Sequence, residues 1–207
     1  MKSKNLFAKA LLFSGTPILY FFHPFKFYGT ENLPADGGFI IASNHIYWLD
    51  AFYIALGSKK NVHFMAKSEL FRYKFFNWFF RSLNAFPVKR GCFDRRAIKT
   101  ATEIVSQGDV LGIFPEGGIV TRDGRPAKAK WGVAYITHQC RCPVVPVSIC
   151  SYKGKGFFKK IIVRFGEPIA YESFGFSQNP DRAQYSAAAD YIMQKIITQW
   201  EKGNERS

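Results

Sequence analysis

The sequence lacks most of the patterns by which common protein classes are recognised. Its four cysteines include no C-x-x-C pair and show no metal-ligand spacing with the four histidines. It has no uninterrupted apolar run of roughly 18 residues, the length of a confident membrane-spanning helix. Zinc-finger and RNP-like patterns are absent, and the basic residues form no single dense run. We therefore expect reduced, buried thiols, no metal site and no nucleic-acid partner.

Acidic residues are also scarce. The chain of 207 residues has 15 Asp and Glu against 29 Lys and Arg, which gives a formal net charge of +14. Such an excess favours an anionic partner, either phospholipid head groups, a phosphorylated substrate or nucleic acid. The 22 phenylalanines among these scattered cations favour a lipid interface, with stacking on single-stranded nucleic acid as the alternative. The length suits one domain with a single core.

The N-terminal segment, residues 1–24, combines early lysines with an uncharged apolar run over residues 10–22. It resembles the central region of a signal peptide, but no small-residue cleavage site follows, and Gly15 and Pro17 interrupt the run. We expect a monotopic helix or helical hairpin that lies on an anionic membrane surface at the cytoplasmic face. A helix packed against the remaining domain, residues 25–207, is the alternative.

Short β-rich runs alternate with helical patterns in the rest of the chain, which predicts an α/β domain with a mixed, largely parallel sheet flanked by helices. The clearest helix spans residues 94–108, where Asp94 is expected to cap the N-terminus and Gly108 to end the helix. Pro143 and Pro146 indicate that their strand lies at an edge or has an unusual end. Strands are expected over residues 37–43, 62–67, 85–90, 109–114, 143–150 and 159–168, and further helices over 128–140 and 181–202.

Two candidate motifs follow directly after expected strands, at the edge where ligands of parallel sheets collect. The first is S-N-H-I-Y-W-L-D, in which His45 and Asp50 interrupt an apolar and aromatic run. A separation of five residues places the two side chains on different faces of either a helix or a strand. They meet only if the chain turns between them, with His45 past a strand and Asp50 in the first turn of a helix. The alternative is a buried core histidine beside a helix-capping aspartate.

If the pair meets, the carboxylate of Asp50 fixes the imidazole tautomer of His45 and leaves the other ring nitrogen free to accept a hydroxyl proton. The chain has no G-x-S-x-G elbow, and no serine or cysteine stands in a recognisable attack motif. The attacking hydroxyl would then belong to the substrate. This combination indicates acyl transfer to an alcohol in preference to hydrolysis through an acyl-enzyme.

The second motif is I-F-P-E-G-G-I-V-T-R, an expected strand that ends in a glycine turn. Backbone N–H groups around Glu116 and Gly117, with Arg122 beyond them, form a candidate phosphate site. Lys89 and Arg90 end the earlier F-P-V-K-R-G run and are candidates for the same phosphate. The alternatives are a plain surface loop and an exposed strand end, both with solvated cations.

A further segment, V-V-P-V-S-I, contains Val145 and Pro146, which either line an acyl groove or belong to the core. Together the four segments resemble the 1-acyl-sn-glycerol-3-phosphate acyltransferase family of phospholipid synthesis. N-H-I-Y-W-L-D matches the family's N-H-x4-D block, F-P-V-K-R-G its second block, F-P-E-G-G its F-P-E-G block and V-P-V-S-I its Val-Pro block. Their order and spacing agree over roughly residues 35–150.

The resemblance implies that His45 is the general base on the acceptor hydroxyl and Asp50 its orienting partner, while Arg90, Glu116 and Gly117 help bind the glycerol phosphate. It implies acyl transfer from a thioester of coenzyme A or acyl carrier protein to the sn-2 hydroxyl of lysophosphatidate, with phosphatidic acid as product and no metal or other cofactor. The sequence departs from the family's F-P-E-G-T-R-S by a longer loop before the arginine. The alternatives are another acceptor, namely glycerol-3-phosphate, a different lysophospholipid or an aminolipid, and a non-catalytic lipid-binding protein.

Overall fold

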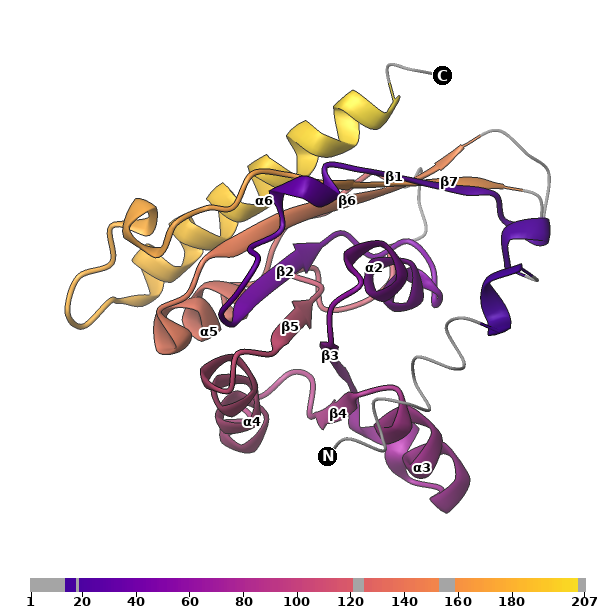
Figure 1. Cartoon of the computed structure of the whole chain (residues 1–207). Helices are drawn as coiled ribbons and strands as arrows, with labels where there is room; N and C mark the ends of the chain where they lie inside the picture. Colours follow the sequence, from indigo (N-terminus) through magenta and orange to yellow (C-terminus); the bar gives the residue numbers. More distant parts are fainter. Residues whose placement is uncertain (1–13, 18, 121–124, 153–158, 205–207) are drawn as a thin grey trace.

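A seven-stranded sheet with the strand order β1-β7-β6-β2-β5-β3-β4 runs through the protein (Figure 1). The computed structural model describes residues 14–17, 19–120, 125–152 and 159–204. All neighbouring strands pair in parallel except β6 and β7, so β1 and β7 run against the others. The predicted mixed, largely parallel sheet is confirmed. The strands are β1 (Phe25–Tyr28), β2 (Phe39–Ser43), β3 (Val62–Lys67), β4 (Ala85–Val88), β5 (Val110–Ile113), β6 (Val144–Tyr152) and β7 (Lys160–Phe165).

Helices bury both faces of this sheet, which explains why its strands are apolar on both sides. Alternate residues of β2 show the division. Ile40 and Ala42 belong to a core shared with α4, α5 and α6, whereas Phe39 and Ile41 belong to a core shared with α2. The helices are α2 (Asp50–Ser58), α3 (Lys74–Ser82), α4 (Arg95–Ser106), α5 (Gly132–Cys140) and α6 (Arg182–Asn204), with short 3-10 turns η1 (Thr30–Asn32), η2 (Ser68–Phe71) and η3 (Tyr171–Phe174). The predicted flanking helices are therefore confirmed.

The proline-containing strand does not lie at an edge. β6 occupies the interior of the sheet between β2 and β7, so that part of the prediction is wrong. Pro143 precedes the strand, and its carbonyl accepts the N–H of Ile40 at 3.0 Å. Pro146 is the third residue of β6 and pairs with Ala42 of β2. The ladder with β7 starts one residue later, where Val147 pairs with Phe165, so the absent N–H of Pro146 falls just before that ladder begins.

The described residues before β1, 14–17 and 19–22, are helical. Leu19 packs against the core that α2 covers. Exposed side chains follow it at Tyr20, Phe21 and Phe22. Within the described ranges, no helix has both the length and the apolar character needed to cross a membrane. Residues 1–13 lie outside the described residues, so membrane association of residues 1–24 stays a prediction.

Candidate active site

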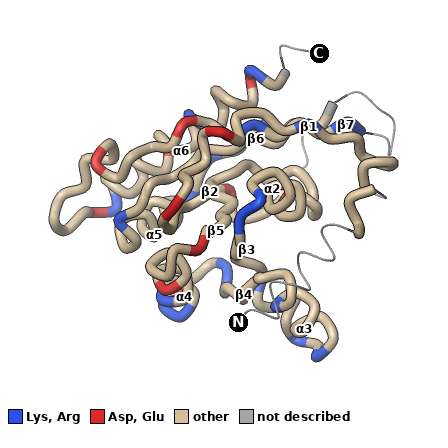
Figure 2. Tube along the Cα trace, in the orientation of Figure 1, with Lys and Arg blue, Asp and Glu red and all other residues tan. Residues whose placement is uncertain are grey.

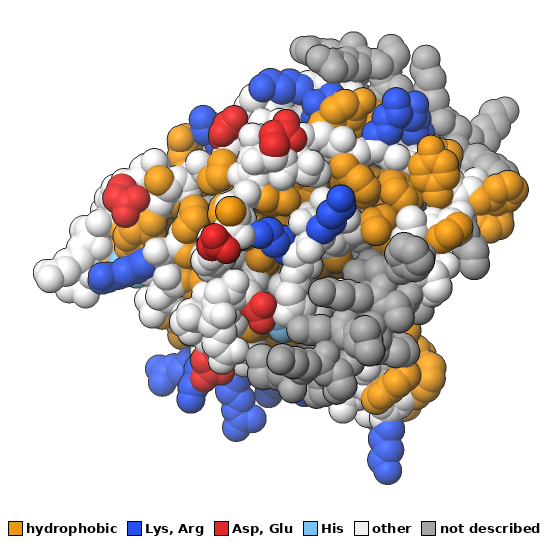
Figure 3. All heavy atoms as spheres, in the orientation of Figure 1, with side chains coloured by type: hydrophobic (Ala, Val, Ile, Leu, Met, Phe, Trp, Pro, Cys, Tyr) orange, Lys and Arg blue, Asp and Glu red, His pale blue; other side chains and the backbone are white. Residues whose placement is uncertain are grey.

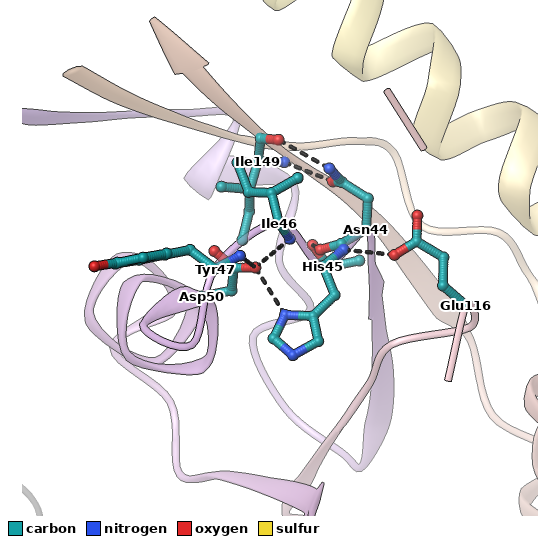
Figure 4. A network of polar contacts seen from close by, with 8 residues as sticks. Asn44, His45, Ile46, Tyr47, Asp50, Glu116 and Ile149 are labelled. Carbon is teal, nitrogen blue, oxygen red and sulfur yellow. Dashed lines mark hydrogen bonds and ion pairs between the residues drawn. The ribbon is translucent and has the colours of Figure 1, made fainter. Parts of the chain in front are cut away.

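His45 and Asp50 meet in the loop between β2 and α2, at the carboxyl edge of the sheet (Figure 4). β2 ends at Ser43 and α2 begins at Asp50, so the predicted junction of strand and helix is confirmed. His45 Nδ1 lies 2.8 Å from Asp50 Oδ2. The loop supplies the turn that brings the two side chains together, as the separation of five residues requires.

Asp50 is completely buried, and its Oδ2 atom accepts three hydrogen bonds. Besides the imidazole, the N–H groups of Ile46 and Tyr47 donate to it at 2.6 and 2.8 Å. The other oxygen, Oδ1, is buried without a hydrogen-bond partner among the described residues. Burial raises the pKa of Asp50, and the hydrogen bond with His45 is the largest effect that opposes the rise. The backbone N–H groups of the loop therefore hold the Asp50 carboxylate in place.

The imidazole of His45 is held in an orientation that suits proton transfer. An ionised Asp50 carboxylate accepts a hydrogen bond from Nδ1–H of His45. In this tautomer Nε2 has no proton and keeps its lone pair. The His45 side chain is only 13% exposed. Its ring stacks on that of Phe114, with centroids 3.9 Å apart and an interplanar angle of 13°. A fixed ring with one basic nitrogen is what a general base requires.

Two further residues support the stacked rings. Phe64 of β3 stacks behind Phe114 at a centroid distance of 5.8 Å. Gly112 of β5 leaves room for the ring of Phe64, because a Cβ added at this glycine would lie 2.3 Å from Cε1 of Phe64. This support was not predicted from the sequence, although a glycine inside a strand is a known sign of close approach by a neighbouring group.

Asn44 fixes the loop from the side of β6. Its buried Nδ2 donates to the carbonyl of Ile149 at 2.9 Å, and its Oδ1 accepts the N–H of the same residue at 2.8 Å. The side chain thus continues the hydrogen bonding of the sheet beyond the end of β2. The asparagine stands beside His45 in the motif, but this anchoring role was not predicted.

Glu116 holds the backbone of His45 from the opposite direction. Its Oε2 accepts the N–H of His45 at 2.8 Å, and its Oε1 accepts the N–H of Ala127, also at 2.8 Å. The N–H of Val120 donates to the His45 carbonyl at 2.8 Å. Burial raises the pKa of Glu116, and the hydrogen bond from Ala127 is the first effect that opposes the rise. These contacts describe a positioning residue, while the phosphate-binding role expected for Glu116 stays a prediction.

Cationic side chains approach the glycine turn that follows Glu116. Gly117 has a φ of 75°, and a Cβ there would lie 2.6 Å from Nζ of Lys130. Arg90 reaches the next residue, with one guanidinium nitrogen 3.6 Å from the position of a Cβ on Gly118. Sequence reasoning predicted Arg90 and Gly117 but not Lys130. A glycine turn beside two cations is suited to bind a phosphate.

The remaining predicted residues differ in their placement. Lys89 is exposed after β4, and its N–H donates to the Asp94 carboxylate at 2.9 Å. The same carboxylate caps α4 as predicted, accepting the first-turn N–H groups at 3.1 and 3.2 Å. Arg122 lies outside the described residues. Val145 and Pro146 are buried, and Val145 packs in the core that α2 covers, so the acyl groove stays a prediction.

A sheet with a His–Asp pair at its carboxyl edge, in which the aspartate is buried, is typical of an α/β enzyme. A protein-family model described as "Acyltransferase" matches residues 24–150. The 1-acyl-sn-glycerol-3-phosphate acyltransferase of Bacillus subtilis (strain 168) is 34% identical over 175 residues, which cover 83% of this chain and 85% of that protein. The chain belongs to the acyltransferase family.

Two further relatives support this assignment. A 1-acyl-sn-glycerol-3-phosphate acyltransferase of Streptococcus pneumoniae (strain ATCC BAA-255 / R6) is 31% identical over 149 residues, which span 69% of this chain and 54% of that protein. The crystal structure of the 1-acyl-sn-glycerophosphate (LPA) acyltransferase PlsC from Thermotoga maritima matches with a TM-score of 0.75 and 26% identity, covering 98% of this chain and 82% of that one. The family resemblance and the enzyme class predicted from the motifs are thereby confirmed.

Proposed function

We propose that this acyltransferase moves a fatty acyl group from an acyl thioester to the sn-2 hydroxyl of 1-acyl-sn-glycerol-3-phosphate, which forms phosphatidic acid. The observation that carries the proposal is the 2.8 Å contact between His45 Nδ1 and the buried Asp50. The cations of Arg90 and Lys130 at the neighbouring turn fit an acceptor that has a phosphate as well as a hydroxyl. The names of the curated relatives support the same acceptor.

The proposed reaction begins when Nε2 of His45 accepts the proton of the acceptor hydroxyl. The acceptor oxygen attacks the thioester carbonyl, and a tetrahedral oxyanion forms. Collapse of this intermediate forms the new ester bond and breaks the carbon–sulfur bond. The departing thiolate takes the proton from the imidazolium and leaves as a free thiol. Asp50 stabilises the imidazolium between these two proton transfers, because its carboxylate lies against Nδ1.

The direct test is an acceptor panel. Purified protein is supplied with labelled acyl-coenzyme A or labelled acyl carrier protein and with lysophosphatidate, glycerol-3-phosphate, a zwitterionic lysophospholipid or an aminolipid. We expect the highest kcat/KM with lysophosphatidate, since its phosphate has cationic partners and the names of the curated relatives specify this acceptor. A higher value with another acceptor would overturn the acceptor assignment, and the two donor arms decide between coenzyme A and carrier protein. Absence of product with every pair, with lipid binding retained, would favour a non-catalytic binder.

We further propose that residues 1–24 hold the enzyme on an anionic membrane surface at the cytoplasmic face. Phe21, which is 71% exposed, supports this proposal. A variant lacking residues 1–13 is the suitable test, because Leu19 packs on the domain and its removal would disturb the core. We expect weaker sedimentation with anionic vesicles. Equal binding by the truncated and full chains would favour the helix packed on the domain.

A further inference from the structure

The segment that connects β3 to β4 exposes an unusual number of aromatic side chains. It contains η2 and α3, and α3 packs beside β4, the last strand of the sheet. Two phenylalanines of α3, Phe79 and Phe80, are partly buried, whereas Phe75 and Trp78 are 66% and 55% exposed. We call the exposed set the aromatic ridge; it consists of Leu70, Tyr73, Phe75, Phe76 and Trp78. Figure 3 shows hydrophobic side chains gathered over α3 at the lower right of the view.

The charges beside the aromatic ridge are mainly positive, and the acidic residue of the segment, Glu69, pairs with Lys67 at 3.2 Å. Arg72, Lys74 and Arg81 are exposed, and residues 70–82 include no aspartate or glutamate. Figure 2 shows the cationic positions on α3. Within α3, Lys74, Asn77 and Arg81 recur at helical spacing on one side, and Arg81 Nε donates to Asn77 Oδ1 at 2.8 Å. The helix therefore has a polar, cationic side and a broad aromatic side, of which the domain covers only part.

We propose that the aromatic ridge rests on an anionic phospholipid bilayer, with α3 lying in the plane of the interface. Tyrosine and tryptophan favour the level of the head groups, phenylalanine favours the acyl boundary, and cations beside them meet anionic head groups. Residues 70–82 have three cations and no carboxylate, and Glu69 is balanced by Lys67, so the ridge lies in a net positive surface. The charge of the segment therefore selects an anionic lipid surface as its occupant.

The segment with the aromatic ridge leaves the sheet at the same end as the candidate active site. η2 begins at Ser68, directly after the last residue of β3. β3 and β2 both run parallel to β5, so η2 leaves the same sheet edge at which His45 follows β2. Docking of the aromatic ridge brings that edge to the membrane. The inference is separate from the acyl transfer proposed above and from residues 1–24, because it concerns binding by another segment.

Charge variants provide a matched test in the full chain. One variant carries Arg72→Gln, Lys74→Gln and Arg81→Gln; the control carries Arg95→Gln, Arg96→Gln and Lys99→Gln on α4, and both lose three positive charges. Sedimentation with vesicles of phosphatidylglycerol and phosphatidylcholine measures partitioning without any acyl donor. We expect about tenfold weaker partitioning for the α3 variant and at most about twofold for the α4 control. Equal losses in the two variants would overturn the proposal, since they would report net charge alone.

An aromatic variant tests the insertion itself. It carries Phe75→Ser, Phe76→Ser and Trp78→Ser, and we expect at least about tenfold weaker partitioning into the same vesicles. Circular dichroism checks that the fold is retained, and a second variant with Phe75→Ser alone gives a smaller loss in the same direction. Vesicle binding equal to that of the unchanged protein in both variants would overturn the proposal. So would a lipid-free dimer, seen by light scattering, that the aromatic variant converts to monomers while its vesicle binding stays unchanged.

Discussion

Two His–Asp pairs lie at opposite ends of the strands of the same sheet, one at the carboxyl ends and one at the amino ends. Only the pair at the carboxyl ends has the features of an active site. His45 follows β2 at the carboxyl edge, where its partner Asp50 has a side chain that is 0% exposed. His63 lies near the start of β3, and its Nε2 is 3.2 Å from Asp109 Oδ2, whose side chain is 26% exposed. A contact between a histidine and an aspartate is therefore not enough to identify a catalytic base.

The surroundings of the second pair explain the difference. Asp109 also accepts a hydrogen bond from Asn61 Nδ2 at 3.0 Å, and Asn61 Oδ1 accepts one from Asn84 Nδ2 at 2.9 Å. These contacts tie together the loops that precede β3, β4 and β5. Burial lowers the pKa of His63, against the opposing charge of Asp109. The second pair joins neighbouring loops, whereas the first orients a ring whose other nitrogen remains available.

The largest expected effect separates the two histidines. His45→Ala removes the proposed base and should lower kcat by about 10³-fold or more. His63→Ala, the matched control, should leave kcat within about twofold, because His63 lies at the other sheet edge. Acyl transfer to lysophosphatidate measures both, with thermal unfolding as a check on the fold. Comparable losses in the two variants would remove the distinction between the pairs.

The next largest effect comes from the carboxylates. In Asp50→Asn, the amide oxygen can take the place of Oδ2 and keep its three hydrogen bonds, while the NH₂ group replaces the unpartnered Oδ1. The imidazole tautomer is then retained but the charge that stabilises the imidazolium is lost. We expect kcat to fall by about 10²-fold, less than when the tautomer is also lost. Asp109→Asn is the control and should leave kcat unchanged; an equal fall in both would contradict the assignment.

The same substitution should have the opposite effect on stability. Burial raises the pKa of Asp50 above its unfolded value, so ionising this carboxyl costs folding free energy. The cost appears as the pH rises from the unfolded pKa through the folded pKa, and it is complete above both. Asp50→Asn has no such charge, and its Tm at pH 7 should equal or exceed that of the unchanged protein. A lower Tm would show that the carboxylate stabilises the loop.

A smaller loss is expected where the backbone of His45 is anchored. Glu116→Gln leaves one amide oxygen for two backbone N–H donors, those of His45 and Ala127, so one of them loses its acceptor. We expect kcat to fall by about tenfold with little change in the KM for lysophosphatidate. Steady-state kinetics over both substrates measures this split. A raised KM at constant kcat would instead support the phosphate-binding role predicted for Glu116.

Much of the fold follows from local sequence signals. Strand β3 has the predicted limits, and α4 begins at Arg95, directly after the capping Asp94. The α3 helix was not predicted: its polar positions Lys74, Asn77 and Arg81 recur at helical spacing, but the helix is only nine residues long, is rich in phenylalanine and has no side-chain cap. Of the two arrangements expected for the proline-containing strand β6, the edge position is wrong, because a proline indicates only that one N–H is missing and not that a neighbouring strand is absent.

The site was predictable where the chemistry lies within one short stretch of chain. The spacing of His45 and Asp50 required a turn, and the loop after β2 supplies it. The bonds that hold this loop come from Ile149 and Glu116, 105 and 71 residues away from their partners in the loop, and local patterns do not show such partners. Lys130 was missed for the same reason, since it reaches the glycine turn only through the fold.

The smallest expected effects concern the exposed cations at the glycine turn, Arg90 and Lys130. Arg90→Ala and Lys130→Ala should each raise the KM for lysophosphatidate by up to about fivefold and leave kcat nearly unchanged, because solvent weakens the attraction of exposed cations for a phosphate. Lys128→Ala removes an exposed charge two residues from Lys130 and is the matched control. The two KM increases should shrink in high salt. A change in kcat without a change in KM would move these residues from the phosphate to the reacting groups, and an equal KM increase in the control would reduce the effect to net charge.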